Sequence, residues 1–199
     1  MSGFLLDTNC ISEVVSLKPD PGVLAWMDAA DEKTLYLSAL TLGEIRKGIV
    51  TLVESKRRAQ LEAWLEIGLR NRFAGRILPV DDAVADRWGM LAGEMKRKGK
   101  PMPAVDAMIA ATALHHSLTV VSRNVNDFKN ADVSVLNPWE IGSLWIPDPR
   151  FDSYGPDGSA DRPSNKPNVP NFEVIKDRYR SLDKGMEHGD CGNRISMGV

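Results

Sequence analysis

Four groups of oxygen-bearing side chains are spread along the sequence, each next to a run of apolar residues. They are Asp7 with Thr8, Glu44, Asp106, and the set of Ser122, Asn124 and Asp127. Carboxylate and amide oxygens are hard ligands that suit Mg²⁺ or Mn²⁺ better than Zn²⁺. One or two such ions can bind a phosphodiester, lower the pKa of an attacking water and stabilise the leaving oxygen. These residue types therefore indicate hydrolysis of a phosphodiester bond.

Taken one at a time, most of these groups also have a purely structural explanation. Asp7 can cap the helix expected after it, because an N-cap Asp accepts a backbone N–H of the first turn. Thr41-x-x-Glu44 matches a capping box, in which a Glu in the first turn folds back on the Thr amide. A capped turn after a strand explains Asn124. Asp106 is harder to explain, because it stands among alanines, where an inward-facing carboxylate needs a cation or a hydrogen-bond partner.

The elements that must position these side chains alternate as in an α/β domain with a mainly parallel sheet. Short apolar runs predict strands over residues 3–6, 34–37, 77–80, 118–122 and 133–136. Amphipathic stretches between them predict helices over residues 10–17, 22–30, 42–53, 55–73, 83–98 and 104–116. In an open α/β sheet, ligands bind at the carboxyl ends of the strands. Because the oxygen-bearing groups stand at strand ends and helix starts, we expect them to meet at this edge.

The composition changes after Leu144 and divides the chain into two parts. Residues 145–199 hold 12 Gly and Pro in 55 positions, whereas residues 1–144 hold 16 in 144. The second part has few apolar residues at a regular period, so it cannot bury enough surface to offset its ordering entropy. We expect one globular domain over residues 1–144 and a largely disordered extension over residues 145–199, with a short helix near 174–182.

Charge, cysteine content and hydropathy exclude several classes of protein. The 25 Lys and Arg against 27 Asp and Glu give a net charge of -2, so a polyanion must be held locally and not by an overall basic field. The two cysteines, Cys10 and Cys191, indicate neither a disulfide framework nor a zinc site. No apolar stretch reaches the roughly 18 residues of a membrane span, and the N-terminus lacks the basic region of a signal peptide. We therefore expect a soluble protein of the cytoplasm.

Four sequence motifs carry a resemblance to a known family. They are Leu5-Leu6-Asp7-Thr8-Asn9, Leu42-Gly43-Glu44-Ile45, Asp106-Ala107-Met108-Ile109-Ala110-Ala111-Thr112-Ala113, and Val121-Ser122-Arg123-Asn124 with Asp127-Phe128. Together, from residue 4 to about residue 140, they resemble PIN-domain ribonucleases, and among these the VapC/FitB-like toxins of type II toxin–antitoxin pairs. Any one motif is weak, but the set is specific because it keeps the family's order and spacing.

The resemblance implies a fold, an activity and a set of catalytic residues. The fold is a PIN-like three-layer α/β/α sandwich with a central, mainly parallel sheet. The activity is endonucleolytic cleavage of RNA at an acidic pocket that holds Mg²⁺ or Mn²⁺. By motif, Asp7, Glu44 and Asp106 correspond to the family's catalytic, metal-binding carboxylates.

The resemblance is incomplete at the fourth acidic position of the family. That position falls on Asn124, which carries no charge, and Asp127 follows three residues later. Asp127 is then either a helper of the site or a plain cap. Thr8 or Ser122 would support the site by orienting a ligand through a hydrogen bond.

Two protein partners are also implied by the resemblance: a second copy of the chain in a homodimer, and a small antitoxin that lies over the active site. Trp64 and Leu69 have helical spacings that can serve a partner groove, although completion of the domain core is the explanation we favour. Among the basic residues, Arg46, Lys47 and Arg123 stand closest in sequence to the site residues and are candidates for holding the RNA backbone.

Two other functions remain open on the sequence alone. A metal-dependent phosphatase can use Asp7 as a nucleophile, but Asp7-Thr8-Asn9 lacks a second Asp two residues on, and the chain has no Gly-rich P-loop. A PIN-like module without activity can use its carboxylates as helix caps and bind a protein or RNA. The uncharged Asn124 keeps this second alternative open.

Overall fold

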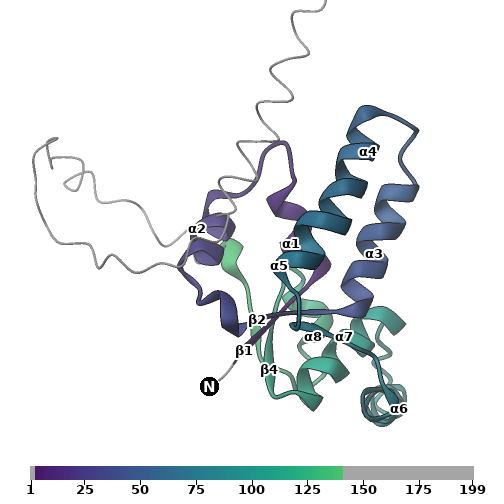
Figure 1. Cartoon of the computed structure of the whole chain (residues 1–199). Helices are drawn as coiled ribbons and strands as arrows, with labels where there is room; N and C mark the ends of the chain where they lie inside the picture. Colours follow the sequence, from purple (N-terminus) through teal and green to yellow (C-terminus); the bar gives the residue numbers. More distant parts are fainter. Residues whose placement is uncertain (1–2, 141–199) are drawn as a thin grey trace, which may run out of the picture. The chain divides into compact units, whose positions relative to one another are not determined.

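The computed structural model describes residues 3–140, which form a sheet between helices (Figure 1). The predicted boundary after Leu144, the extension over residues 145–199 and the helix near 174–182 lie outside the described residues. No helix in the described part of the chain is long and apolar enough to cross a membrane.

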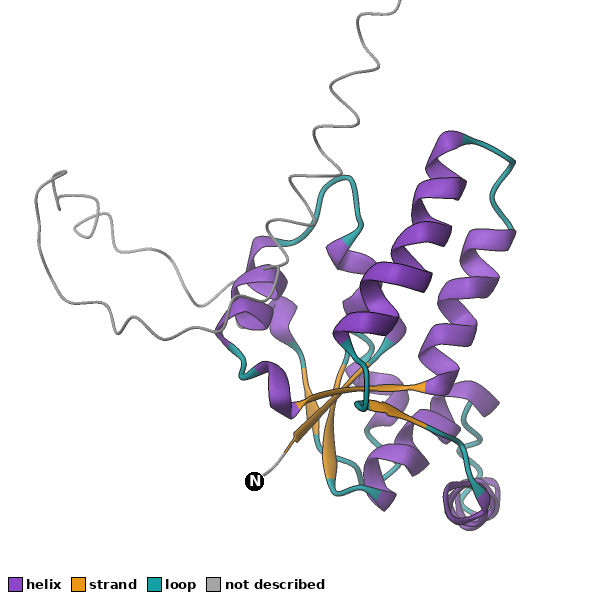
Figure 2. Cartoon of the chain, viewed as in Figure 1, coloured by secondary structure: helices purple, strands orange, loops and turns teal. Residues whose placement is uncertain are grey.

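Five parallel strands form the sheet, in the order β3-β2-β1-β4-β5 (Figure 2). Their bounds are β1 Gly3–Leu6, β2 Leu35–Ser38, β3 Ile77–Leu78, β4 Leu118–Val121 and β5 Val135–Leu136. The predicted strands are therefore confirmed, although β3 and β5 are shorter than the apolar runs that predict them. The central strand β1 pairs with β2 on one side and with β4 on the other.

The central strands are apolar on both faces because helices cover both sides of a parallel sheet. Leu5, Leu6, Leu37 and Val121 are all fully buried. At the start of β1, Gly3 allows a close approach between neighbouring strands, since a Cβ there would lie 2.8 Å from the side chain of Leu118. The sheet therefore holds the end of β1 firmly in place.

Helices cover the sheet in two groups. One group is α1 (Thr8–Val14), α2 (Pro21–Ala29), α3 (Ala39–Val50) and α4 (Lys56–Ala63), and the other is α6 (Asp82–Arg97), α7 (Ala104–His115) and α8 (Val125–Phe128). Figure 1 shows α3 and α4 side by side as a hairpin, with α6, α7 and α8 on the other side of the sheet. α7 packs against both β4 and α6. This arrangement confirms the predicted α/β/α fold.

The helix predicted over residues 55–73 forms, but it is not uniform. α4 continues into a π-helical segment, Trp64–Leu69, and then into α5 (Arg70–Arg72). Trp64 and Leu69 are buried, with 3% and 2% of their surface exposed. The alternative in which they face a partner groove is therefore wrong, and both complete the core.

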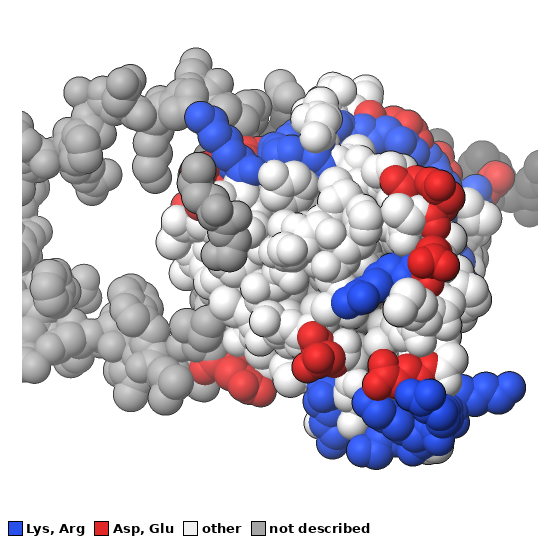
Figure 3. All heavy atoms as spheres, turned by 90° about the horizontal axis from the view of Figure 1, so that it is seen from below, with Lys and Arg blue, Asp and Glu red and all other residues white. Residues whose placement is uncertain are grey.

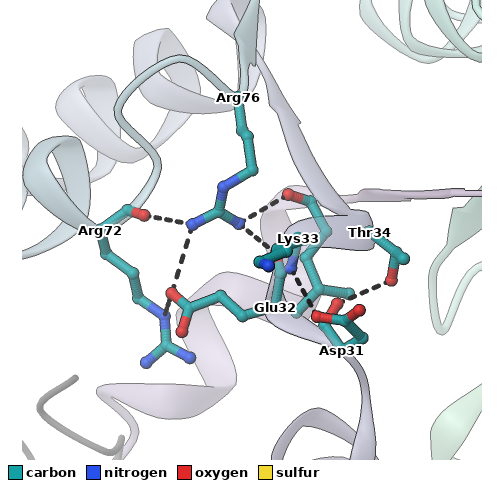
Figure 4. Close-up of polar contacts among 7 residues, drawn as sticks. Asp31, Glu32, Lys33, Thr34, Arg72 and Arg76 are labelled. Carbon is teal, nitrogen blue, oxygen red and sulfur yellow. Dashed lines mark hydrogen bonds and ion pairs between the residues drawn. The ribbon is translucent and has the colours of Figure 1, made fainter. Parts of the chain in front are cut away.

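A largely buried group of charges joins this helical stretch to the start of β2 (Figure 4). Glu32, in the short 3₁₀ helix Glu32–Thr34, pairs with Arg72 at 3.1 Å and with Arg76 at 3.2 Å. Arg76 also donates to the backbone oxygen of Leu35 at 2.9 Å. Asp31 caps the 3₁₀ helix by accepting from the N–H of Lys33. These contacts fix β2, and with it the start of α3, against the rest of the domain.

Candidate active site

Polar residues lie beside one another at the edge of the sheet where the parallel strands end. The register aligns the end of β1 with β2 and with β4, so that Asp7, Ser38 and Ser122 lie at the same level. All three residues are buried. Asp7 caps α1 and Ser38 caps α3. The edge of the sheet therefore also fixes the two helices that carry Thr8 and Glu44.

Asp7 is buried, with 5% of its surface exposed, and is held by hydrogen bonds. One carboxylate oxygen accepts from the N–H of Thr8 at 2.7 Å, and the other accepts from the Asn9 amide at 2.8 Å and the Ser122 hydroxyl at 2.6 Å. Burial raises the pKa of Asp7, the bonds from Ser122 and Thr8 oppose this rise, and the charge of Glu44 adds to it. Asp7 is the helix cap that the sequence predicts, and it is also tied to the side chain of Ser122, which directly follows β4.

The hydroxyl of Ser122 joins the turn after β4 to the segment of Asp7 and Asn9. It donates to Asp7, and it accepts from the Asn9 amide and from the backbone N–H of Asn124, both at 3.0 Å. A hydroxyl has one donor and two acceptor lone pairs, so its hydrogen-bonding capacity is used in full. Ser122 thus fixes both the orientation of Asp7 and the start of the turn that follows β4.

Glu44 lies in the second turn of α3, because the helix begins at Ala39 and is capped by Ser38. The predicted capping box of Thr41 and Glu44 is therefore wrong, since the helix starts three residues before the motif requires. Instead, Oε2 of Glu44 accepts a hydrogen bond from the Thr8 hydroxyl at 2.5 Å. Glu44 is turned toward the start of α1, where Asp7 lies.

Asp106 stands in the first turn of α7 and is partly buried. Burial raises its pKa most, and the charges of Asp7, Asp127 and Glu44 raise it further. These four carboxylates come from four different segments, and the charges of the other three act on Asp106. All four are candidates from the sequence, and Asp127, proposed there as a helper or a plain cap, is one of them.

The donor set fits a hard divalent cation in chemical type. Within residues 3–140, however, no three His, Cys, Asp or Glu side chains stand close enough together to hold a metal ion as they are placed. The chemistry of the set is nevertheless that of a cation site, because carboxylates whose charges raise the pKa of a neighbour repel one another and a cation among them relieves that repulsion.

Asn124 and Asp127 stand at the start of α8, and both are exposed. Asn124 occupies the N-cap position, but its side chain makes no capping hydrogen bond. Asp127 is not the cap either, because it lies inside the first turn and its backbone N–H donates to the carbonyl of Asn124 at 3.0 Å. The plain-cap explanation of Asp127 is therefore wrong, and its charge reaches Asp106.

The candidate RNA-binding residues on α3 differ from each other in their surroundings. Arg46 forms an ion pair with Glu66 of the π-helical segment. Since residues two apart on a helix point to opposite sides, this places Arg46 away from Glu44. Lys47, which is exposed, is separated from Glu44 by three residues and so shares its side of α3. Lys47 is thus better placed than Arg46 to meet a ligand at the carboxylates.

Other Lys and Arg residues gather on the α6 side of the molecule, with Asp and Glu next to them (Figure 3). The end of α6 carries three exposed basic residues, Lys96, Arg97 and Lys98. Lys98 forms an ion pair with Glu94 at 2.7 Å. Such i,i+4 pairs are common on solvated helix faces. This cluster belongs to α6 and not to the carboxylate edge.

The sequence reasoning missed Trp139, which follows β5 at the carboxylate edge of the sheet. The guanidinium of Arg123, an exposed residue, lies 5.4 Å from the centroid of the Trp139 ring. No local signal marks it, because Trp139 stands three residues beyond the predicted strand over residues 133–136 and its partner Arg123 follows a different strand.

A family model described as the PIN domain matches residues 4–133. This chain belongs to the PIN-domain family. The matched range contains Asp7, Glu44, Asp106 and Asp127, and it spans the sheet from β1 to the loop before β5.

This chain is similar to curated proteins and solved structures over almost the whole length of those proteins. This chain is 44% identical over 135 residues to Toxin FitB of Neisseria gonorrhoeae, and the match covers 68% of this chain and 97% of FitB. It is 40% identical over 136 residues to the VapC ribonuclease Y4jK of Sinorhizobium fredii, covering 68% of this chain and 97% of the relative. A solved structure of FitAB bound to a DNA fragment matches with a TM-score of 0.66 and 43% identity, covering 68% of this chain and 95% of that one.

Proposed function

We propose that this PIN domain is a metal-dependent endoribonuclease and the toxin component of a type II toxin–antitoxin pair. The observation that carries the proposal is that Asp7, Glu44, Asp106 and Asp127 come from four segments to one edge of the sheet, where the charges of the other three raise the pKa of Asp106. Two relatives that share at least 40% of their residues with this chain are named as a toxin and as a ribonuclease. Hydrolysis of RNA phosphodiester bonds is the activity that fits both the residues and the relatives.

In this proposal Asp7, Glu44 and Asp106 are the catalytic carboxylates and hold the cation. PIN-domain ribonucleases generally depend on a divalent metal, and we propose Mg²⁺, with Mn²⁺ as a substitute. Asp127 supplies the fourth negative charge, because its charge already acts on Asp106, and Asn124 contributes an amide oxygen at most. When bound, the ion polarises the scissile phosphate and lowers the pKa of the attacking water.

The chain's own polar groups keep these carboxylates in place. Ser122 and Asn9 hold one oxygen of Asp7, and the Thr8 hydroxyl holds Glu44. Such supporting hydrogen bonds matter because a metal ligand free to rotate pays an entropic cost on binding, and loss of one typically lowers metal affinity or activity by about 10- to 100-fold. Thr8 and Ser122 are therefore positioning residues of the site.

The same relatives support a proposal about the partners of this chain. FitAB, the solved neighbour, is an assembly bound to DNA, and we propose that this chain likewise acts with a cognate antitoxin and as a homodimer. Its substrate is RNA, with Lys47 and Arg123 as backbone contacts and Arg46 as a weaker candidate. We place its action in the cytoplasm, and assign the activity to residues 1–144, with residues 145–199 as an extension.

Two observations favour a second candidate, a PIN-like module that binds RNA or protein without cutting. Asn124 is uncharged, and the carboxylates of residues 3–140 are not closed around a cation as they are placed. This candidate requires the same surface but no hydrolysis. The test of the proposal therefore has to measure cleavage and not only binding.

The experiment is cleavage of a mixed cellular RNA pool by the full chain in Mg²⁺, with Asp106→Asn beside it. Asp82→Asn is the matched control, because Asp82 also stands in the first turn of a helix and is exposed. We expect wild type and Asp82→Asn to cut RNA, Asp106→Asn to be inactive but folded, and a phosphomonoester to stay intact. Cleavage by Asp106→Asn contradicts the proposal, and rapid phosphomonoester turnover favours a phosphatase.

A further inference from the structure

Trp139 and Arg123 form a cation–π pair at the edge of the sheet that carries the carboxylates. The guanidinium of Arg123 lies 5.4 Å from the centroid of the Trp139 ring. We infer that this pair is a stacking platform for a nucleobase of single-stranded RNA next to the scissile phosphate. The inference rests on the proposed function, because it takes RNA as the ligand of the site.

The pairing of β4 with β5 places both residues at this edge. β5 ends at Leu136, whose carbonyl accepts from the backbone N–H of Ser122 at 3.0 Å. Arg123 follows Ser122 directly, and Trp139 comes three residues after Leu136. The pair therefore continues the row of strand ends to which Asp7 and Ser122 belong.

Hydrogen bonds fix the backbone of Arg123 relative to the carboxylates and hold the turn that carries Trp139. The N–H of Arg123 donates to the side-chain oxygen of Asn9 at 3.4 Å, and the Asn9 amide donates to Asp7 at 2.8 Å. On the other side, the N–H of Trp139 donates to the side-chain oxygen of Asn137 at 3.1 Å. The ring and the guanidinium are thus presented at a constant place beside the site.

Arg123 is available to a ligand in a way that Arg46 is not. Arg123 is exposed, and in the described part of the chain no carboxylate forms an ion pair with it, whereas Arg46 is paired with Glu66. Trp139 is partly exposed as well. The surface at this point therefore offers an aromatic face and an unpaired positive charge together.

That combination matches the way single-stranded RNA is bound. Its bases leave the stack and lie on aromatic rings or on arginine planes, while its phosphates are held by positive charge. Every base has a π-face, so a platform of this kind holds the strand without reading its sequence. Trp139 contacts the base in this assignment. Arg123, besides its proposed contact with the RNA backbone, holds the ring in place through a cation–π contact.

The test compares two strands that differ only in their bases. One is a fluorescein-labelled single-stranded RNA of mixed sequence and about 12 nucleotides, and the other is the same ribose-phosphate backbone without bases. Binding to the full chain is measured by fluorescence anisotropy in an Asp106→Asn background, so that the RNA is not cut. Trp139→Leu and Trp139→Phe test the ring, and Trp88→Leu on α6 is the matched control.

We expect Trp139→Leu to weaken binding of the intact RNA by about 5- to 100-fold, the range for loss of one stacked base. Binding of the base-free strand should not change. Trp139→Phe keeps most of the affinity, and Trp88→Leu keeps all of it. Arg123→Lys retains the positive charge but not the planar guanidinium, so we expect it to weaken binding of the intact RNA. In a chain that already carries Trp139→Leu, it should cause little further base-dependent loss of affinity.

The platform is refuted if Trp139→Leu lowers the affinity for both strands equally, or for neither strand. It is also refuted if the chain binds neither strand. Cleavage of the same RNA by the chain with Asp106 intact is measured in parallel. If the RNA is cut but Trp139→Leu changes the binding of both strands equally, only the platform is refuted. If Trp139→Leu weakens binding of the intact RNA alone but the RNA is not cut, the platform is supported and the proposed hydrolysis is contradicted.

Discussion

Replacement of Ser122 by alanine tests what holds the carboxylates in place. The hydroxyl donates to buried Asp7 at 2.6 Å and accepts from Asn9 and from the N–H of Asn124, both at 3.0 Å. A hydrogen bond to a charged group contributes about 1.5 to 3 kcal/mol, and a neutral one about 0.5 to 1.5 kcal/mol. Because the Asn9 amide keeps its bond to Asp7, we expect Ser122→Ala to lower the free energy of unfolding by about 2 to 4 kcal/mol.

The size of this loss depends on pH, because the hydrogen bond is strongest to the ionised form of Asp7. Burial raises the pKa of Asp7, and the bond from Ser122 opposes that rise. Without the bond, the pKa of Asp7 in the folded state rises further, so the variant loses additional stability as the pH rises through that folded-state pKa. The difference between wild type and Ser122→Ala is therefore larger at neutral pH than in acid, where Asp7 is protonated in both.

Urea denaturation of the metal-free full chain at neutral and acid pH measures the difference. Ser38→Ala is the matched control, since Ser38 is also a buried serine at a strand end, but its hydroxyl caps α3 by accepting from the N–H of Leu40 at 3.2 Å. We expect it to cost about 1 kcal/mol, the usual value for an N-cap, at either pH. A Ser122→Ala penalty no larger than that of Ser38→Ala, or one independent of pH, would refute the reasoning.

Mg²⁺ should stabilise the wild-type chain but not Asp106→Asn: at 100 times Kd a ligand adds about 2.7 kcal/mol, or about 5 to 10 °C in a thermal melt. Without metal at neutral pH, Asp106→Asn should be the more stable protein in urea, because burial and the charge of Asp7 raise the pKa of Asp106. This advantage should vanish in acid, where Asp106 is protonated both folded and unfolded, and equal urea midpoints at neutral pH would contradict it. Gly3→Ala should cost about 1 to 3 kcal/mol, since its Cβ meets Leu118 at 2.8 Å. Gly43→Ala, in a helix with nothing within 4 Å, should instead add about 0.5 to 1 kcal/mol, and a loss there would count against this account of packing.

The sheet is predictable from the sequence because its central strands are isolated apolar runs with clear ends. β1 has the predicted bounds, Gly3–Leu6, because Asp7 stops the run and caps the next helix. The edge strands are different. β3 keeps only Ile77 and Leu78, because it pairs with β2 on one side alone and two residues find partners there. Apolar composition predicts that a strand exists, but pairing with its neighbours sets its length.

The start of α3 shows why part of the candidate site escapes sequence reasoning. Ser38 and Thr41 are both good N-caps, and only tertiary contacts choose between them. Thr41 is fully buried, and its hydroxyl donates to the backbone oxygen of Leu6 at 3.4 Å, so Ser38 takes the cap. Glu44 then moves from the first turn to the second and meets Thr8. Trp139 is missed for another reason: its partner Arg123 comes from a different strand end, and no local pattern joins the two.

The central claim is that the carboxylate edge of this PIN domain cuts RNA with a divalent cation. The most direct test is cleavage of a mixed RNA pool by the purified full chain in Mg²⁺, in chelator, and after Mg²⁺ or Mn²⁺ is added back in excess. Our account predicts internal cuts that stop in chelator and return with either ion. Cleavage that continues at full rate in chelator, or a folded chain that leaves every RNA intact with either ion, would contradict it.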